Sequence, residues 1–310
     1  MIEKKQWQQE IVKRYEKNPI ITFDDIPQAA NSVFNAAATR YQDKYLLLLR
    51  VEGLEGKSRF FLAESADGIN FKISREPVME WSKEEPFKTY EKRGVEDPRI
   101  TKIGDTYYIL YVAYSHAGPR IALASTKDFK TFKRVTLISE PENKDAVLFP
   151  KKINGYFVRF DRPMAAGGNI WISYSPDLLY WGNSRCVMEN RPGYWDSHRI
   201  GACAPPIETD RGWLEIYHGV KKTTSGSIYR LGVALFDLKD PSQLIARGEA
   251  PILSPREYYE RVGDVDNVVF CGGAILEEKT QEVKLYYGAC DTSICLGTAN
   301  LSHLVERCFD

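Results

Sequence analysis

The sequence predicts an all-β fold, a five-bladed β-propeller, from three observations. Five apolar-aromatic runs recur along the 310 residues, and their starts are 62, 49, 57 and 71 residues apart. Most runs are followed by a second strand-like segment and a turn rich in Asp, Ser or Gly. No Gly/Ser-rich or Pro-rich linker divides the chain. Similar β-units repeated at this spacing are typical of radial arrays, so we expect a single domain over residues 1–310.

Each run is expected to supply a strand to one blade. The runs are Tyr45–Arg50, Tyr107–Ser115, Tyr156–Arg162, Trp213–His218 and Lys284–Asp291. Two stacked β-sandwich domains are the alternative, which explains the strand content but not the regular recurrence.

A helix is expected over residues 3–16, ahead of the first blade. Trp7, Ile11 and Tyr15 fall at i, i+4 and i+8 with charges between them, and Asn18-Pro19 ends the pattern. This N-terminal helical arm, residues 1–17, is expected to pack on the body of the protein or on a second copy in a homo-oligomer.

Composition excludes several classes of protein. Lys+Arg and Asp+Glu are 42 each, so the formal net charge of zero gives no general attraction to nucleic acid or to an anionic membrane. No segment is apolar enough to span a bilayer, and the first residues lack the apolar core of a signal peptide. The six cysteines form no CxxC pair and no zinc spacing, so we expect reduced, mostly buried thiols in a cytoplasmic protein without a metal.

The segment from Arg93 to Arg99 concentrates two acids and two arginines around Pro98. Proline biases Asp97 towards an extended backbone at a strand entrance, and strand alternation places Glu96 on the opposite face. A rigid carboxylate between cations is what acid catalysis on a sugar requires, so Asp97 is the candidate acid. Glu96 is expected to orient Arg99 or Arg93. A solvated turn with a surface ion pair is the alternative.

Four of the five runs end in a polar residue where apolar alternation should continue. These residues are Arg50, Arg162, His218 and Asp291. Equivalent positions of successive blades surround one axis, so these side chains are expected to converge at one mouth of the channel. Asp291 is a second carboxylate there, either holding sugar hydroxyls or acting as a base.

Further cations point to an anion. Lys144 precedes a strand, and Arg199 and Tyr229 flank the run that ends at His218. Guanidinium groups and lysine suit phosphate. Neither a Walker loop nor a GxGxxG motif occurs, so free phosphate or a small anionic group is favoured over a nucleotide.

These residues resemble glycoside hydrolase family 130, the inverting β-mannoside phosphorylases on a five-bladed propeller. The likeness covers nearly the whole chain after the N-terminal helix. It rests on Val95-Glu96-Asp97-Pro98-Arg99-Ile100, Val33-Phe34-Asn35, Leu48-Leu49-Arg50, Lys144-Asp145-Ala146-Val147, Ile216-Tyr217-His218-Gly219, Gly263-Asp264-Val265 and Tyr286-Tyr287-Gly288 with Asp291.

The resemblance implies roles for these positions. Asp97 is the general acid, which relays a proton through the mannosyl 3-hydroxyl. Substrate-binding residues are Asn35, Arg50, Glu96, Arg99 and Asp291, and phosphate-binding residues are Lys144, Arg162, Arg199, His218 and Tyr229. Family members more often have arginine at Lys144 and lysine at Arg199, and both exchanges preserve charge. The stretch Asp266 to Gly273 looks more like the branch acting on β-1,2-linked mannose.

The expected reaction is therefore reversible phosphorolysis of a β-mannoside to α-mannose 1-phosphate, with phosphate as a substrate and no cofactor. The expected partners are these small molecules. An inverting β-mannosidase that uses water, phosphorylases of β-1,4-linked mannosides and a non-catalytic sugar-binding propeller remain alternatives.

Overall fold

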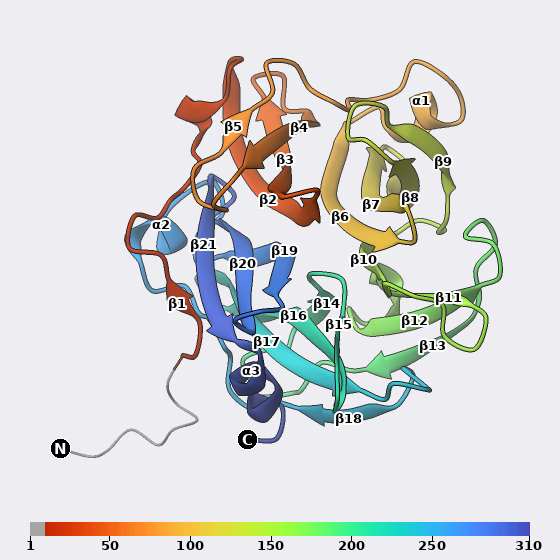
Figure 1. The fold of residues 1–310 in the computed structure, drawn as a ribbon, viewed down its shortest axis with the longest axis vertical. Coiled ribbons are helices and arrows are strands. Elements are labelled where there is room, and N and C mark those ends of the chain that lie inside the picture. Colours follow the sequence, from red (N-terminus) through yellow and green to blue (C-terminus); the bar gives the residue numbers. More distant parts are fainter. Residues whose placement is uncertain (1–9) are drawn as a thin grey trace.

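The computed structural model describes residues 10–310, and these form five small antiparallel sheets around a central axis (Figure 1). The five-bladed propeller is thereby confirmed, and the two-sandwich alternative is wrong. In blades 1 to 4 the strands run outward from the axis in chain order, whereas the outermost strand of blade 5 comes from the beginning of the chain. The predicted runs lie in the strands next to the innermost ones.

The blades are built from the following strands. Blade 1 is β2 (Ala30–Tyr41), β3 (Lys44–Gly53), β4 (Ser58–Ser65) and β5 (Lys72–Ile73). Blade 2 is β6 (Val95–Ile103), β7 (Thr106–Ser115), β8 (Gly118–Thr126) and β9 (Lys133–Leu137). Blade 3 is β10 (Asn143–Leu148), β11 (Phe157–Pro163), β12 (Ile170–Ser175) and β13 (Gly182–Met188). Blade 4 is β14 (Arg199–Ala202), β15 (Ile207–Thr209), β16 (Gly212–Thr223), β17 (Gly226–Phe236) and β18 (Leu244–Arg247). Blade 5 is β19 (Val269–Glu277), β20 (Glu282–Ala289), β21 (Ser293–Asn300) and β1 (Lys13–Arg14).

Helices are few and short. They are α1 (Phe87–Tyr90), α2 (Tyr258–Arg261), α3 (Leu301–Arg307) and the 3-10 turns η2 (Phe23–Asp25) and η3 (Met164–Ala166). Within residues 10–310, no helix is long and apolar enough to cross a membrane. All six cysteines have free thiols, and five of them are buried, as expected.

Each blade packs against two neighbours, which explains why the runs are apolar on both faces. In β3, Leu46 and Leu48 pack in a cluster shared with blade 2, whereas Leu47 and Leu49 pack in one shared with blade 5. Successive side chains of a strand point to opposite faces, so four consecutive leucines are needed to fill both contacts. Every pair of neighbouring blades is joined by such a cluster.

The expected N-terminal helix is wrong for the residues that the structure describes, and residues 3–9 lie outside them. Lys13 and Arg14 instead form β1, which pairs with Thr298 and Gly297 of β21 and completes blade 5. Val12 is buried, and Arg14 donates to Glu260, whose side chain is fully buried. Backbone pairing and burial at an open sheet edge outweigh the weak preference of a short segment for a helix.

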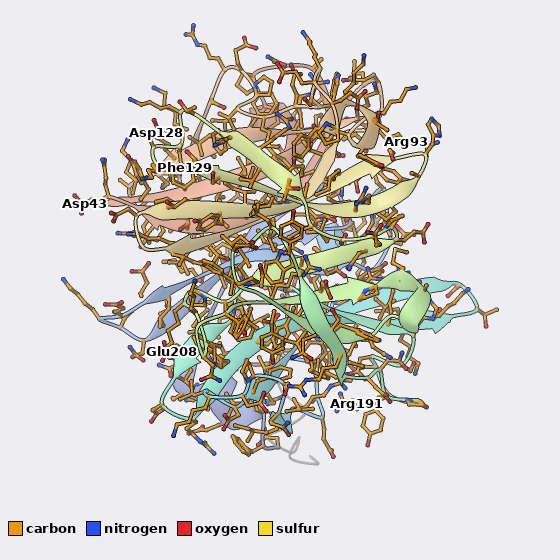
Figure 2. All side chains as sticks on the ribbon, turned by 90° about the vertical axis from the view of Figure 1, so that its right-hand side faces the viewer. Asp43, Arg93, Asp128, Phe129, Arg191 and Glu208 are labelled. Atoms are coloured by element: carbon orange, nitrogen blue, oxygen red, sulfur yellow. The ribbon has the colours of Figure 1, made fainter. Side chains whose placement is uncertain are left out.

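The propeller has two faces, which Figure 2 shows edge-on. Asp43 of the β2–β3 hairpin and Asp128 of the β8–β9 turn lie at one face, and Arg93 and Arg191 lie at the other. We call these the Asp43 face and the Arg93 face. Arg93 stands just before β6, and Asp97 lies near the start of this strand. From there β6 runs away from the Arg93 face towards its hairpin at Gly104. The polar residues of the innermost strands therefore lie towards the Arg93 face.

Candidate active site

Bulges in the innermost strands direct polar side chains at the axis. The register of β2 shifts between Phe34 and Ala37, that of β6 between Glu96 and Arg99, and that of β10 between Lys144 and Val147. Within each shift one non-glycine residue has left-handed φ: Asn35 at 48°, Asp97 at 47° and Asp145 at 56°. Bulges re-aim side chains and concentrate near active sites, and Asn and Asp tolerate this conformation best.

Two expectations about Asp97 are therefore wrong. Its backbone is left-handed rather than extended, and Glu96 and Asp97 line the same cavity instead of opposite faces. The bulge overrides both the preference of a residue before proline and the alternation of a regular strand.

Asp97 is held by two donors from blade 1. Its Oδ1 accepts hydrogen bonds from Asn35 Nδ2 at 2.9 Å and from Arg50 Nη1 at 2.8 Å. Burial alone would raise the pKa of Asp97, but Arg50, Lys144 and Arg99 outweigh it and hold that pKa well below the usual range. In the unliganded protein, Asp97 is an oriented carboxylate anion.

Glu96 joins the two cationic regions of the site. Arg50 Nη2 lies 3.1 Å from Glu96 Oε1, and Lys144 Nζ lies 3.5 Å from Glu96 Oε2. The structure thus pairs Glu96 with Arg50 and Lys144, rather than with the expected Arg99 or Arg93.

Arg162 and His218 lie around Asp145. Arg162 Nε is 2.5 Å from Asp145 Oδ2, and His218 Nε2 is 3.6 Å from the same oxygen. Burial, together with the positive charges of Arg162 and Arg199 and against the opposing effect of Asp145, lowers the pKa of His218 to about 3. His218 is therefore neutral at physiological pH and has one ring N–H to donate.

Gly201 permits this close packing. A Cβ atom at Gly201 would lie 2.2 Å from Asp145 Oδ2 and 2.5 Å from His218 Cε1. Any larger residue would push these two side chains apart.

Arg199 lies beside a tyrosine hydroxyl rather than beside a carboxylate. Its Nη2 donates to the hydroxyl of Tyr229, and within residues 10–310 it has no carboxylate partner. An uncompensated guanidinium beside a tyrosine hydroxyl is suited to an incoming anion.

Asp291 follows β20 and faces the acid from blade 5. Burial, together with the negative charges of Asp97, Asp264 and Glu96 and against the opposing effect of Arg50, raises the pKa of Asp291 to about 6. Asp291 can therefore exchange a proton near neutral pH, unlike Asp97.

These residues line one cavity of about 320 Å³. It brings together all the expected site residues except Arg99, namely Asn35, Arg50, Glu96, Asp97, Lys144, Arg162, Arg199, His218, Tyr229 and Asp291. Carboxylates and Asn35 suit the hydroxyls of a sugar, and the Lys144, Arg162 and Arg199 side suits an oxyanion. The carboxylates of Glu96 and Asp145 compensate part of the positive charge of the cavity.

Arg99 lies behind the cavity wall. It is 1% exposed, and its guanidinium donates to the carbonyl oxygens of Asp97 and Pro98 and lies over the ring of Phe270. Arg99 therefore supports the bulge of β6 from behind the cavity wall and does not contact a ligand in the cavity.

Sequence reasoning did not assign six further cavity residues. They are Tyr114, Asp145, Met164, Val265, Val268 and Phe270. Asp145 has a signal in the repeat, because it occupies in β10 the bulge position of Asn35 in β2 and Asp97 in β6. The loop residues Val265 and Val268 have no such signal. Within residues 10–310, no group of His, Cys, Asp and Glu is arranged to hold a metal ion.

The family model and the known proteins that this chain resembles agree on one class of enzyme, the mannoside phosphorylases. The sequence model of a family described as beta-1,4-mannooligosaccharide phosphorylase matches residues 2–309. A beta-1,2-mannobiose phosphorylase of Thermoanaerobacter sp. is 40% identical over 279 residues, which cover 85% of this chain and 88% of that protein. A beta-1,4-mannooligosaccharide phosphorylase of Ruminococcus albus is 34% identical over 305 residues, covering 96% and 90%.

A solved structure has the same architecture. The complex of beta-1,2-mannobiose phosphorylase from Listeria innocua with beta-1,2-mannobiose superposes with a TM-score of 0.86 at 34% identity. The match covers 96% of this chain and 99% of that one.

Proposed function

Because the chain belongs to glycoside hydrolase family 130 and is a glycoside phosphorylase of that family, we propose that it cleaves β-1,2-linked mannobiose or mannooligosaccharides. Phosphate is the second substrate and α-mannose 1-phosphate is the product, formed reversibly and with inversion. The observation that carries the proposal is a single cavity lined both by the Asp97 carboxylate of blade 2 and by the cations Lys144, Arg162 and Arg199 of blades 3 and 4.

Asp97 acts as the general acid in this proposal. As the bond between mannosyl C1 and the bridging oxygen breaks, a proton from Asp97 ends on the departing oxygen, by relay through the mannosyl 3-hydroxyl. The hydrogen bonds from Asn35 and Arg50 fix the carboxylate in place beforehand, so little reorientation is required in the transition state.

Phosphate is the nucleophile, bound by the cationic side of the cavity. One of its oxygens bonds to C1 from the face opposite the leaving sugar, which gives the α-configured product. The oxocarbenium-like transition state is positive, so the phosphate charge also stabilises it. Arg199 and Tyr229 offer donors with few competing partners, and neutral His218 offers one more.

The charge of the phosphate site influences the protonation of the general acid. Asp97 is ionised in the unliganded protein partly because of Lys144, yet phosphorolysis requires it to carry a proton. Phosphate beside Lys144 would cancel part of that positive field, so the pKa of Asp97 is expected to rise when phosphate binds.

Two observations support the β-1,2 linkage: the identity to a named relative and the sequence of one segment of the site. The 40% identical relative carries that specificity in its name, whereas the 34% identical relative from Ruminococcus albus is named for β-1,4-linked chains. The sequence from Asp266 to Gly273 favours the first group, and Val268 and Phe270 of this stretch reach the cavity wall.

The test is a reaction followed by NMR, with β-1,2-mannobiose and β-1,4-mannobiose each offered with and without phosphate. The proposal predicts α-mannose 1-phosphate and mannose from the β-1,2 substrate, only when phosphate is present. Faster turnover of the β-1,4 substrate would contradict the linkage.

An inverting β-mannosidase is the second candidate, favoured by one observation. With a pKa of about 6, Asp291 is a carboxylate suited to accept a proton from water. Release of free mannose at an undiminished rate without phosphate would support this alternative.

A further inference from the structure

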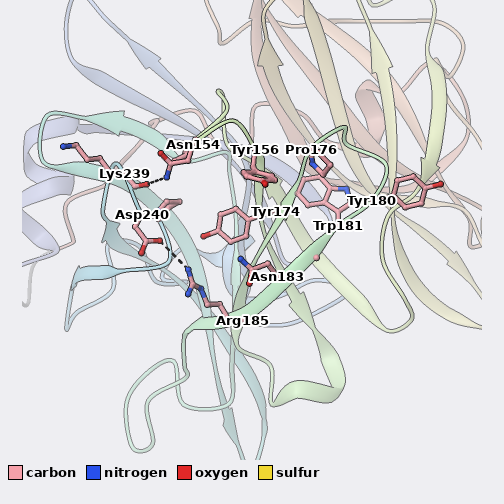
Figure 3. Close-up of a pocket in the computed structure, with 13 residues that line it drawn as sticks. Asn154, Tyr156, Tyr174, Pro176, Tyr180, Trp181, Asn183, Arg185, Lys239 and Asp240 are labelled. Carbon is pink, nitrogen blue, oxygen red and sulfur yellow. Dashed lines mark hydrogen bonds and ion pairs between the residues drawn. The ribbon is translucent and has the colours of Figure 1, made fainter.

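A second cavity lies between blades 3 and 4, away from the candidate active site. Its volume is about 600 Å³, within the roughly 300–1,000 Å³ range of small-molecule sites. The hairpin at Asn154, the turn at Tyr180 and the loop at Lys239 border it (Figure 3). The hairpin and the turn are the blade 3 equivalents of the segments at Asp43 and Asp128, so the cavity opens at the Asp43 face.

Tyrosines distinguish this cavity from the same region of its sister blades. Strand register makes Tyr174 of β12 equivalent to Glu64 of β4 and Ser125 of β8, since Val158, Leu46 and Tyr108 are their respective partners. By the same register, Tyr156 corresponds to Lys44 in blade 1 and Thr106 in blade 2.

A third tyrosine lies on the turn after β12. Ser175, Asp177 and Tyr180 repeat the spacing of Ser65, Asp67 and Asn70, and in both turns the aspartate accepts hydrogen bonds from backbone N–H groups. Three tyrosines therefore occupy positions where blade 1 has charged or small polar residues. Tyr174 packs against the apolar cluster between blades 3 and 4, whereas Tyr156 and Tyr180 belong to none of the clusters of buried side chains.

The aromatic groups are available to a ligand. Tyr156 is 49% exposed and Tyr180 is 77% exposed, whereas Tyr174 is half-buried. No hydroxyl of these three tyrosines has a hydrogen-bond partner within residues 10–310. Trp181 between them is fixed, since its Nε1 donates to the carbonyl oxygen of Leu178 at 3.0 Å. Figure 3 shows Tyr156, Tyr174 and Trp181 gathered around the cavity, with Tyr180 at its rim.

Arg185 and Asp240 form one ion pair in the cavity, at 3.6 Å, and Asn154 donates to the carbonyl oxygen of Lys239 at 3.0 Å. The ammonium group of Lys239 points away from the tyrosines (Figure 3). In the candidate active site, by contrast, Arg199 has no carboxylate partner within residues 10–310. The second cavity is therefore suited to a neutral ligand with apolar faces and hydroxyl edges, rather than to a phosphorylated one.

We propose that this cavity is a second carbohydrate site, which binds a neutral β-mannooligosaccharide and retains long substrate chains on the enzyme. The cavity itself indicates that the ligand is a carbohydrate, whereas the choice of a mannoside rests on the proposed function. The aromatic rings stack on the apolar faces of the sugar, and the tyrosine hydroxyls and Asn183 bond to its hydroxyls.

The test is calorimetry of β-1,2-mannohexaose binding without phosphate, in the wild type and in Tyr156→Thr/Tyr174→Ser, which introduces the blade 2 residues. The wild type is expected to show two binding events, and the double variant is expected to lose one of them or weaken it at least about tenfold. Phe23→Ser is the matched control, because Phe23 is also 49% exposed and lies outside the cavity. Phosphorolysis of mannobiose is expected to be unchanged in the variants, whereas KM for the hexasaccharide rises in the double variant alone.

Two results would overturn the proposal. One is two unchanged binding events in a folded double variant. The other is a smaller oligomer of the double variant in sedimentation, because the cavity would then be a contact between copies of the chain. If mannobiose is not phosphorolysed but the tyrosine-dependent binding persists, the proposed function fails and this site stands.

Discussion

Replacing Asp97 by Asn separates the acid role from a structural one. The amide keeps the shape of the side chain and an oxygen that can still accept from Asn35 and Arg50, and Arg50 retains Glu96 as an ion-pair partner. General acids contribute about 10²–10⁴-fold, so kcat/KM for β-1,2-mannobiose is expected to fall by that factor. At about 1.4 kcal/mol per tenfold, this is a loss of about 3–6 kcal/mol of transition-state stabilisation.

The assay follows α-mannose 1-phosphate, and thermal unfolding controls for folding. An aryl β-mannoside whose phenolate leaves without protonation is the matched substrate, and the variant is expected to lose much less activity on it. More than roughly a tenth of the wild-type rate on mannobiose would refute the acid role. So would an equal loss on both substrates, since a general structural defect does not distinguish leaving groups.

Three further predictions concern phosphate binding, the pH dependence of stability, and the contacts of β1, the strand that completes blade 5. Arg199→Ala is expected to raise KM for phosphate about 10–100-fold and to change KM for the mannoside little, because it removes a charged donor from the phosphate site only. An equal increase in the two KM values would show that Arg199 does not belong to the phosphate site. Asp291→Asn is expected to raise Tm at pH 8 but not at pH 4 while reducing activity. The folded-state pKa of about 6 lies above the ordinary aspartate pKa of 3.8, so the wild type loses stability as pH rises through this interval, by up to about 3 kcal/mol. A pH-independent difference in Tm would contradict this. Arg14→Ala is expected to cost about 3–5 kcal/mol in urea unfolding, because it leaves the fully buried Glu260 without its cation. Lys44→Ala, which breaks the exposed pair with Glu64, is its control and is expected to cost under about 1 kcal/mol.

The fold was accessible from the sequence because its signal is repeated. Runs such as Leu46 to Leu49 are apolar on both faces only if a neighbour packs on each side, and five such runs imply a closed ring. The segment that closes the ring was not accessible in this way. Ile11 and Tyr15 fit a helical spacing, and the pairing of Lys13 with Thr298 depends on an edge 285 residues away in the chain.

The composition of the site was also largely predictable, because equivalent strand positions of a propeller meet at its axis. The geometry was not. Proline predicts an extended Asp97, and only the bulge imposed by blade packing gives the left-handed backbone that places Asp97 beside Glu96. Arg99 carries the same charge as the cations that line the cavity, and the local sequence does not show that its side chain lies behind the cavity wall.

A crystal structure of the protein with phosphate and a non-cleavable β-mannoside would show the proposed arrangement of both substrates. We expect the anion to be bonded to Arg162 and Arg199 close to Lys144, and the sugar to lie between the anion and Asp97. A phosphate bound away from these cations, or on the same side of the sugar as Asp97, would contradict this arrangement.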